Sequence, residues 1–194
     1  MKIVVDENNP YVKEAFSTLG ETILLPGKQI TREVLRDATL LVCRSTIKVD
    51  ADLLEGTAVK FVGTATIGMD HFDTAYLKKA GIHYCSAPGC NADSVADYVT
   101  AALLYWGERR QVSLQGKTIG VVGCGNVGSR VVRRAQGLGM RVIVNDPPLA
   151  RETGDLRYRP LEEIFAADII TLHTPLTYKG QDATFHLVDD TFFR

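Results

Sequence analysis

Short apolar runs alternate with longer amphipathic stretches along the chain, from Ile3 to Leu172. Brief apolar runs bounded by Gly, Pro or acidic residues are typical of buried parallel strands. The stretches between them carry apolar residues at helical spacing. This alternation predicts an α/β protein with parallel sheets. The expected strands are residues 3–5, 22–25, 40–43, 60–62, 82–85, 118–122, 141–145 and 168–172.

The helical stretches divide the chain into two units. Val95, Val99 and Leu103 recur at helical spacing in a long helix expected at residues 92–110, with Asn91 available as its N-cap. This helix is expected to join two α/β units, residues 1–91 and residues 92–194. The other expected helices are residues 11–19, 31–36, 50–55, 73–80, 126–138 and 160–165.

Composition excludes several classes of protein. The 194 residues are 45% apolar and 23% charged, as in soluble globular proteins, which argues against a disordered chain. With 22 basic and 23 acidic residues, the net charge is −1, so there is no basic excess for nucleic acid. No apolar run approaches the ~20 residues that span a membrane, and the N-terminus lacks the apolar core of a signal peptide. A cytoplasmic protein is expected.

The four cysteines are Cys43, Cys85, Cys90 and Cys124. They form no C-x-x-C pair and have no metal-ligand spacing with a histidine. Reduced thiols and no metal site are therefore expected.

A glycine motif, G-x-G-x-x-G at Gly123, Gly125 and Gly128, comes directly after the strand 118–122 and opens the next helix. The strand after that helix ends at Asp146, about 20 residues beyond the motif, as in a βαβ dinucleotide-binding unit. A Gly-rich turn with a surface Asp after it is the alternative. The strand, helix, strand and acid in this order favour the dinucleotide site.

The position of each glycine in the motif has a physical explanation. The first glycine permits a tight turn, the second lets a pyrophosphate approach the backbone, and the third lets helix and strand pack closely. Asn126 and Val127 stand at the helix start, where free N–H groups attract phosphate. Asp146 can accept hydrogen bonds from the ribose hydroxyls and repel a 2′-phosphate, which favours NAD over NADP.

His173 and Thr174 come after the strand 168–172, at the edge of the sheet where ligands bind in parallel α/β folds. Thr174 is placed to contact the nicotinamide side of the cofactor. His173 could act as a general base, but a structural residue beside the cofactor is the favoured interpretation.

The first unit has ligand signals of its own. Arg44, Ser45 and Thr46 come after one predicted strand, and residues 64–68, which include Thr66, come after the next. Hydroxyl groups, loop N–H groups and a guanidinium suit a carboxylate or phosphate. Ordinary loop chemistry explains the same residues, and the two interpretations stay open at this point.

Five segments together resemble the D-2-hydroxyacid dehydrogenases, and the resemblance spans essentially the whole chain. These segments are residues 63–71 (GTATIGMDH), 87–92 (APGCNA), 123–128 (GCGNVG), 146–148 (DPP) and 173–176 (HTPL). The resemblance implies that residues 1–91 are the flavodoxin-like N-terminal portion of the substrate domain. It implies that residues 92–194 are the first half of the NAD-binding Rossmann domain.

The resemblance also implies an activity, the NAD-linked oxidation of a 2-hydroxy acid. Residues 5–8 (VDEN), residues 44–46 and the doubled proline after Asp146 fit a member of the family that acts on a small phosphorylated hydroxy acid. Ser45 and Thr66, with Arg44, would then contact substrate. Asp146 and Thr174 would contact NAD.

The chain departs from the family in one respect. The catalytic Arg, Glu and His of the family are expected beyond residue 194, so no catalytic residue is expected within this chain. It resembles the N-terminal part of an enzyme that forms a homodimer at full length. The alternatives are a dehydrogenase of another 2-hydroxy acid, a non-catalytic NAD-binding module, or a truncated remnant.

Overall fold

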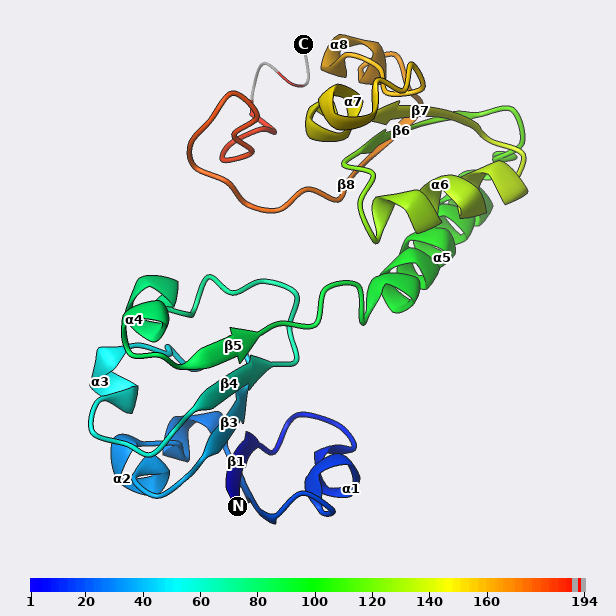
Figure 1. The fold of residues 1–194 in the computed structure, drawn as a ribbon. Coiled ribbons are helices and arrows are strands. Elements are labelled where there is room, and N and C mark those ends of the chain that lie inside the picture. The colour runs from blue at the N-terminus through cyan, green and yellow to red at the C-terminus, as the bar shows by residue number, and fades with distance from the viewer. Residues whose placement is uncertain (190–191, 193–194) are drawn as a thin grey trace. The chain divides into compact units, whose positions relative to one another are not determined.

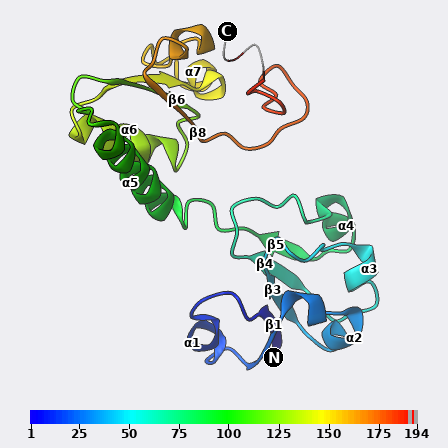
Figure 2. The ribbon, with the colours of Figure 1, turned by 180° about the vertical axis from the view of Figure 1, so that it is seen from behind.

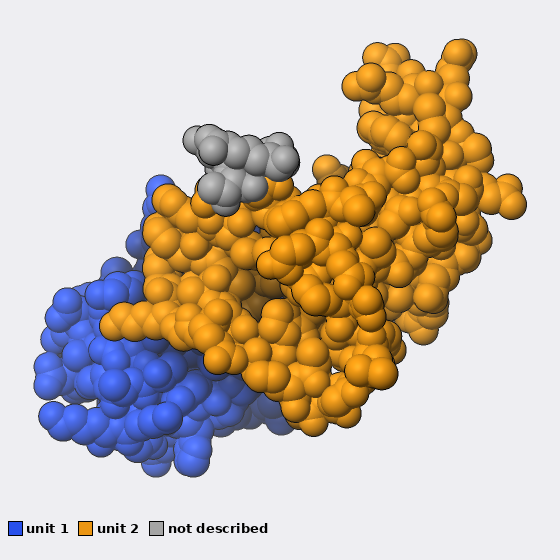
Figure 3. Space-filling model, turned by 90° about the horizontal axis from the view of Figure 1, so that it is seen from above, with its two compact units in different colours: residues 1–90 blue, residues 91–194 orange. Residues whose placement is uncertain are grey.

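The chain folds into two compact units, Met1–Cys90 and Asn91–Arg194 (Figure 3). This is a computed structural model, and it describes residues 1–189 and 192. Each unit has its own parallel sheet and its own buried apolar cluster, as expected of two separately packed α/β units.

The first unit is built on a five-stranded parallel sheet in the order β2-β1-β3-β4-β5, of which Figure 1 labels β1, β3, β4 and β5. This order is that of flavodoxin-like folds, which confirms the expected fold class. Val4 lies beside Ile23 of one neighbouring strand and Leu41 of the other. The strands are β1 (Lys2–Asp6), β2 (Glu21–Leu25), β3 (Leu40–Cys43), β4 (Phe61–Thr64) and β5 (His83–Cys85).

Successive side chains of a strand point to opposite faces of the sheet, so the apolar strands present apolar side chains on both faces. Helices cover both of these faces. Ile3 and Val5 pack with Val12 of α1 (Val12–Phe16), whereas Val4 belongs to the larger cluster that includes Leu35. Figures 1 and 2 show α1 on one side of the sheet and the other helices on the opposite side. These are α2 (Arg32–Leu35), α3 (Ala51–Leu54) and α4 (Thr74–Lys79), with a short 3₁₀ turn, η1 (Gly27–Gln29).

Cys43, at the end of β3, is completely buried in the larger cluster. Burial, assisted by the nearby charge of Asp6, raises the pKa of its thiol to about 12. All four cysteines are free, and Cys85 and Cys90 are exposed.

The second unit has three parallel strands in the order β7-β6-β8. The chain moves from β6 to β7 on one side and then crosses to β8 on the other. The carboxyl ends of β6 and β8 therefore lie side by side where the winding reverses. The elements are α5 (Ala92–Arg110), β6 (Thr118–Val122), α6 (Gly128–Gly137), β7 (Arg141–Asn145), α7 (Pro147–Thr153), α8 (Leu161–Ile164) and β8 (Ile169–Leu172).

Helices also cover both faces of this sheet. Ala96 and Leu103 of α5 pack with Val131 of α6 against one face. On the other face, a Cβ on Gly120 of β6 would lie 2.6 Å from the side chain of Ile164, so α8 packs directly on the strand backbone.

Several expected boundaries differ from the structure. Helix α1 ends at Phe16. The N–H groups of Leu19 and Gly20 then donate to the carbonyl oxygen of Phe16 in turns. Helix α6 begins at Gly128, two residues later than expected. Asn91 occupies the N-cap position of α5, as predicted, and its carbonyl accepts from the N–H of Val95, although its side chain makes no capping hydrogen bond. The sequence pattern predicts neither the turn η1 nor helix α7.

Across the described residues, none of the helices is both long and apolar enough to cross a membrane. Within residues 1–189 and 192, no group of three or more His, Cys, Asp or Glu side chains is arranged to hold a metal ion.

Candidate functional site

A cavity of about 600 Å³ opens at the carboxyl ends of the strands in the second unit. It is lined by four of the residues that the sequence assigns to a dinucleotide, Gly123, Gly125, Asp146 and Thr174. These residues come from three different segments of the chain. The strand order β7-β6-β8 explains their meeting, because it places the ends of all three strands at one edge.

The glycines of the motif sit in different surroundings. Gly123 has a φ of +85° and a Cβ there would lie 2.7 Å from the carbonyl oxygen of His173. A Cβ on Gly128 would fall directly on the carbonyl oxygen of Gly123, so α6 and the turn approach as closely as their backbones allow. Gly125 has no neighbour within 4 Å of its Cβ position. Its exposed backbone therefore leaves room for a ligand.

Asn126, Val127 and Gly128 do not line this cavity. Asn126 is exposed, and its carbonyl accepts a hydrogen bond from the guanidinium of Arg130 at 2.7 Å. The carbonyl of Val127 begins the helix by accepting from the N–H of Val131. These residues shape the turn on which Gly125 is carried.

Asp146 directly follows β7, and two backbone N–H groups donate to its carboxylate. Its Oδ2 accepts from Cys124 at 2.7 Å, and its Oδ1 accepts from Leu149 at 3.0 Å. The carboxylate thus caps α7 and fixes the glycine turn at the same time. It keeps lone pairs for further acceptance, since each carboxylate oxygen has two.

His173 and Thr174 come after β8 and lie against the glycine turn. The N–H of His173 donates to the carbonyl of Val122 at 2.7 Å, and its ring Nε2 lies 3.0 Å from the hydroxyl of Thr171. Burial lowers the pKa of His173, which keeps the ring neutral near pH 7. The methyl group of Thr174 would be 3.0 Å from a Cβ on Gly123.

Residues 177–187 form an outer wall of the cavity that the sequence analysis did not find. The backbone N–H of Thr177 donates to the hydroxyl of Thr184, and the N–H of Thr184 donates to the hydroxyl of Thr177. These two hydrogen bonds close the loop. Arg151 of α7 forms a two-pronged ion pair with Asp182 of the loop. No periodicity or motif marks this loop, because its contacts are between polar side chains far apart in sequence.

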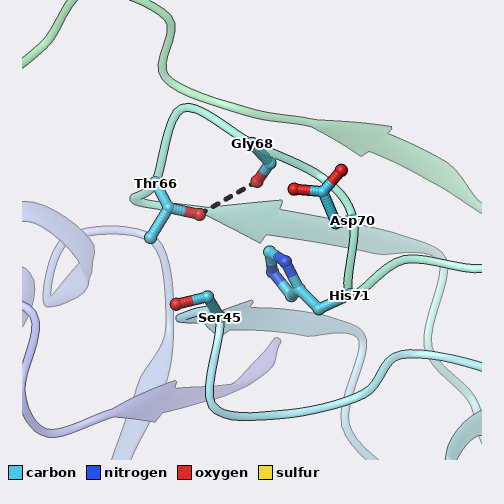
Figure 4. Close-up of a pocket in the computed structure, with 5 residues that line it drawn as sticks. All are labelled: Ser45, Thr66, Gly68, Asp70 and His71. Carbon is cyan, nitrogen blue, oxygen red and sulfur yellow. Dashed lines mark hydrogen bonds between the residues drawn. The ribbon is translucent and has the colours of Figure 1, made fainter. Parts of the chain in front are cut away.

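A second hollow, of about 470 Å³, lies in the first unit (Figure 4). Ser45 and Thr66, for which the family resemblance implies contact with substrate, both line it. The hydroxyl of Thr66 lies 2.7 Å from that of Thr64 and donates to the carbonyl of Gly68 at 3.1 Å. Arg44 is exposed but does not line this hollow.

Gly68, Asp70 and His71 complete the lining, and all three belong to the segment 63–71 that carries the family resemblance. The Nε2 of His71 is buried without a hydrogen-bond partner. Burial lowers the pKa of this ring, against the opposing charge of Asp70. Phe72 and Asp73 do have structural roles, since Phe72 is buried and Asp73 caps α4 through Tyr76.

Residues 3–188 match the family model of the D-isomer specific 2-hydroxyacid dehydrogenase, catalytic domain. The chain belongs to this family, in agreement with the resemblance found in its sequence. A solved structure with the same fold is NAD+-bound 3-phosphoglycerate dehydrogenase of Entamoeba histolytica, with a TM-score of 0.74 and 30% identity. The likeness covers 91% of this chain and 63% of that one.

Two curated relatives carry a more particular name, erythronate-4-phosphate dehydrogenase. That of Bacteroides thetaiotaomicron is 47% identical over 196 residues, which cover 100% of this chain and 56% of the relative. That of Enterobacter sp. (strain 638) is 50% identical over 195 residues, covering 100% of this chain and 52% of the relative. The chain therefore spans about half the length of the curated relatives that it matches.

Proposed function

We propose that this chain forms part of an NAD-dependent dehydrogenase that oxidises 4-phospho-D-erythronate at its 2-hydroxyl to the 2-oxo acid. This reaction is a step in the synthesis of pyridoxal 5′-phosphate. The observation that carries the proposal is the cavity that gathers Gly123, Gly125, Asp146 and Thr174. The names of the two curated relatives support this substrate over other 2-hydroxy acids.

The residues around the cavity fit a dinucleotide. Gly125 offers open backbone for a pyrophosphate, and Asp146 offers carboxylate lone pairs for ribose hydroxyls. Thr174 and His173 form the wall beside Gly123, where the nicotinamide end would lie. NAD, when bound, supplies the acceptor for a hydride. The protein's own contribution here is to hold and orient it.

Substrate contacts are proposed for the first unit. Ser45 and Thr66, on the loops after β3 and β4, both line the hollow in Figure 4. The guanidinium of Arg44 is exposed one residue before Ser45 and suits an anionic group of the substrate. The proposed substrate carries a carboxylate and a phosphate, which the hydroxyl groups and the guanidinium can bind.

We assign no acid/base residue within this chain. His173 is bonded to Thr171 and its pKa is lowered by burial, which suits a neutral wall of the cofactor site. The family's Arg, Glu and His are proposed to belong to a segment outside the 194 residues. A homodimer in the cytoplasm is the proposed state of the whole enzyme, and light scattering after gel filtration tests the dimer.

The direct test uses the polypeptide made from the natural gene. Its intact mass is measured first, and NADH formation is then followed at 340 nm with 4-phospho-D-erythronate, 3-phosphoglycerate and glycolate. The expected result is a mass well above 21.3 kDa and the highest kcat/KM with 4-phospho-D-erythronate. A higher kcat/KM with another acid would show that the enzyme is a dehydrogenase of that 2-hydroxy acid instead. NAD binding without turnover of any acid supports a non-catalytic module.

A further inference from the structure

The first turn of α7 presents no free backbone N–H to the cavity. Pro147 and Pro148 occupy its first two positions and have no N–H to offer. The N–H of Leu149 is donated to Asp146 Oδ1 at 3.0 Å, and that of Ala150 to the carbonyl oxygen of Asp146 at 2.9 Å. Every N–H group of this turn is therefore absent or already used.

This arrangement contrasts with what helix starts usually do. The first N–H groups of a helix ordinarily lack partners and attract phosphate. Asp146, Pro147 and Pro148 all line the cavity, so the start of α7 borders the space proposed for the ribose. The two prolines remove the donors at the place where a phosphate on that ribose would need them.

The nearby cations are also engaged. Arg151 of α7 is paired with Asp182. Arg157 is paired with Asp155 at 2.9 Å and donates to the hydroxyl of Tyr158 at 2.8 Å. Among the described residues that line the cavity, Asp146 and Asp182 place two carboxylates against the one ammonium of Lys179. Because Arg151 already neutralises Asp182, the carboxylate left to face a phosphate on the ribose is that of Asp146, and both arginines are paired.

We propose that the segment Asp146-Pro147-Pro148, and not Asp146 alone, selects NAD over NADP. The carboxylate repels a 2′-phosphate, and the prolines withhold the N–H groups that would otherwise bind it. This inference rests on the proposed function, because it takes the cavity to be the dinucleotide site. Replacing the acid alone would then remove the repulsion without creating a phosphate site.

The test compares four forms of the full-length protein: the natural sequence, Asp146→Ser, Pro147→Ala with Pro148→Ala, and the three changes together. Serine keeps an N-cap oxygen for α7, and alanine restores the N–H groups in a good helix former. NADH and NADPH are titrated against each form by nucleotide fluorescence. The matched comparison is between the Asp146→Ser form and the triple form, which carry the same charge and differ in two N–H groups.

The expected result is that the triple form binds NADPH about tenfold more tightly than Asp146→Ser, a difference of about 1.4 kcal/mol. The two proline changes alone should not improve NADPH binding, because the carboxylate still faces the phosphate. Equal NADPH affinities of Asp146→Ser and the triple form overturn the inference. Failure of the natural protein to bind NADH overturns instead the proposed function on which it rests.

Folding is checked independently by circular dichroism and melting temperature. If the triple form does not fold, Asp146→Ser with Pro148→Ala restores a single N–H group. Its NADPH affinity should then exceed that of Asp146→Ser by about threefold, which is about half of the free energy expected for two N–H groups. No gain in this folded double variant also overturns the inference.

Discussion

The carboxylate of Asp146 lies 2.7 Å from the backbone nitrogen of Cys124 and accepts its N–H. This bond joins the end of β7 to the glycine turn that comes after β6. The second carboxylate oxygen caps α7 through Leu149. One side chain therefore fixes two segments that border the cavity and also faces the space proposed for the ribose.

We expect Asp146→Ala to weaken the fold and the cofactor site together. Loss of the cap and of the bond to Cys124 should lower the free energy of unfolding by about 1–2 kcal/mol. Urea unfolding measures this loss. Asp146→Asn keeps an acceptor for the N–H of Leu149 and should lose less. An unchanged urea midpoint for Asp146→Ala would show that neither bond matters to stability.

The same Asp146→Ala variant should bind NADH more weakly and discriminate less against NADPH. The ribose hydroxyls lose their acceptor and a 2′-phosphate is no longer repelled. Titration with both nucleotides checks this expectation. Unchanged affinities for both would count against the assignment of Asp146 to the dinucleotide.

Gly125→Ala and Gly128→Ala should fail in different ways. A Cβ on Gly125 meets nothing within 4 Å, so the fold should hold while NADH binding weakens at least tenfold, about 1.4 kcal/mol. A Cβ on Gly128 meets the carbonyl oxygen of Gly123, so this variant should lose stability before any ligand is added. Melting curves and NADH titrations separate the two effects. Similar melting temperatures for both variants would contradict the expected difference.

Arg44→Ala should weaken binding of the anionic substrate and leave the fold intact, because the side chain is exposed. The expected change is a severalfold increase in KM for 4-phospho-D-erythronate, steepest at low salt. Arg36→Ala, which removes another exposed arginine of the same unit, is the control for net charge. An equal KM increase in both variants would remove Arg44 from the site.

The buried ring of His173 should make the protein less stable in acid. Its pKa in the folded state lies below the ordinary value of 6.5, so the unfolded chain binds the proton first as pH falls. The free energy of unfolding contributed by the neutral ring is complete above about pH 6.5 and declines below it. Denaturant unfolding at pH 7.5 and 5.5 measures the decline, and His173→Gln should reduce its slope. An unchanged slope in this variant would assign the acid sensitivity to other groups, such as the ring of His71.

Features that depend on local pattern could be predicted from the sequence. The alternation of apolar runs predicts each strand in the described part of the chain to within two residues. The glycine motif marks Gly123 and Gly125, which both line the cavity. Helix α7 escaped prediction because a doubled proline is more typical of a turn. An Asp N-cap with Pro at the first helical position is nevertheless a known start signal.

Other features depend on contacts that no local pattern encodes. The crossing of β8 to the far side of β6, which brings Thr174 beside Gly123, is a matter of topology. The wall formed by residues 177–187 depends on an ion pair between Arg151 and Asp182, which lie on different segments. Asp70 and His71 end the family segment 63–71, but the order of residues in that segment does not show which side chains line a hollow.

Because Cys43 is buried, the rate at which its thiol is alkylated reports how often the first unit opens. With its thiol pKa raised to about 12 and the side chain enclosed, an alkylating reagent can reach Cys43 only when the sheet of this unit separates. Cys85 and Cys90 are exposed and label at once, which sets the zero time. The delay of Cys43 behind them, measured by mass spectrometry, reports how often this unit opens, separately from the unit that carries the glycine motif.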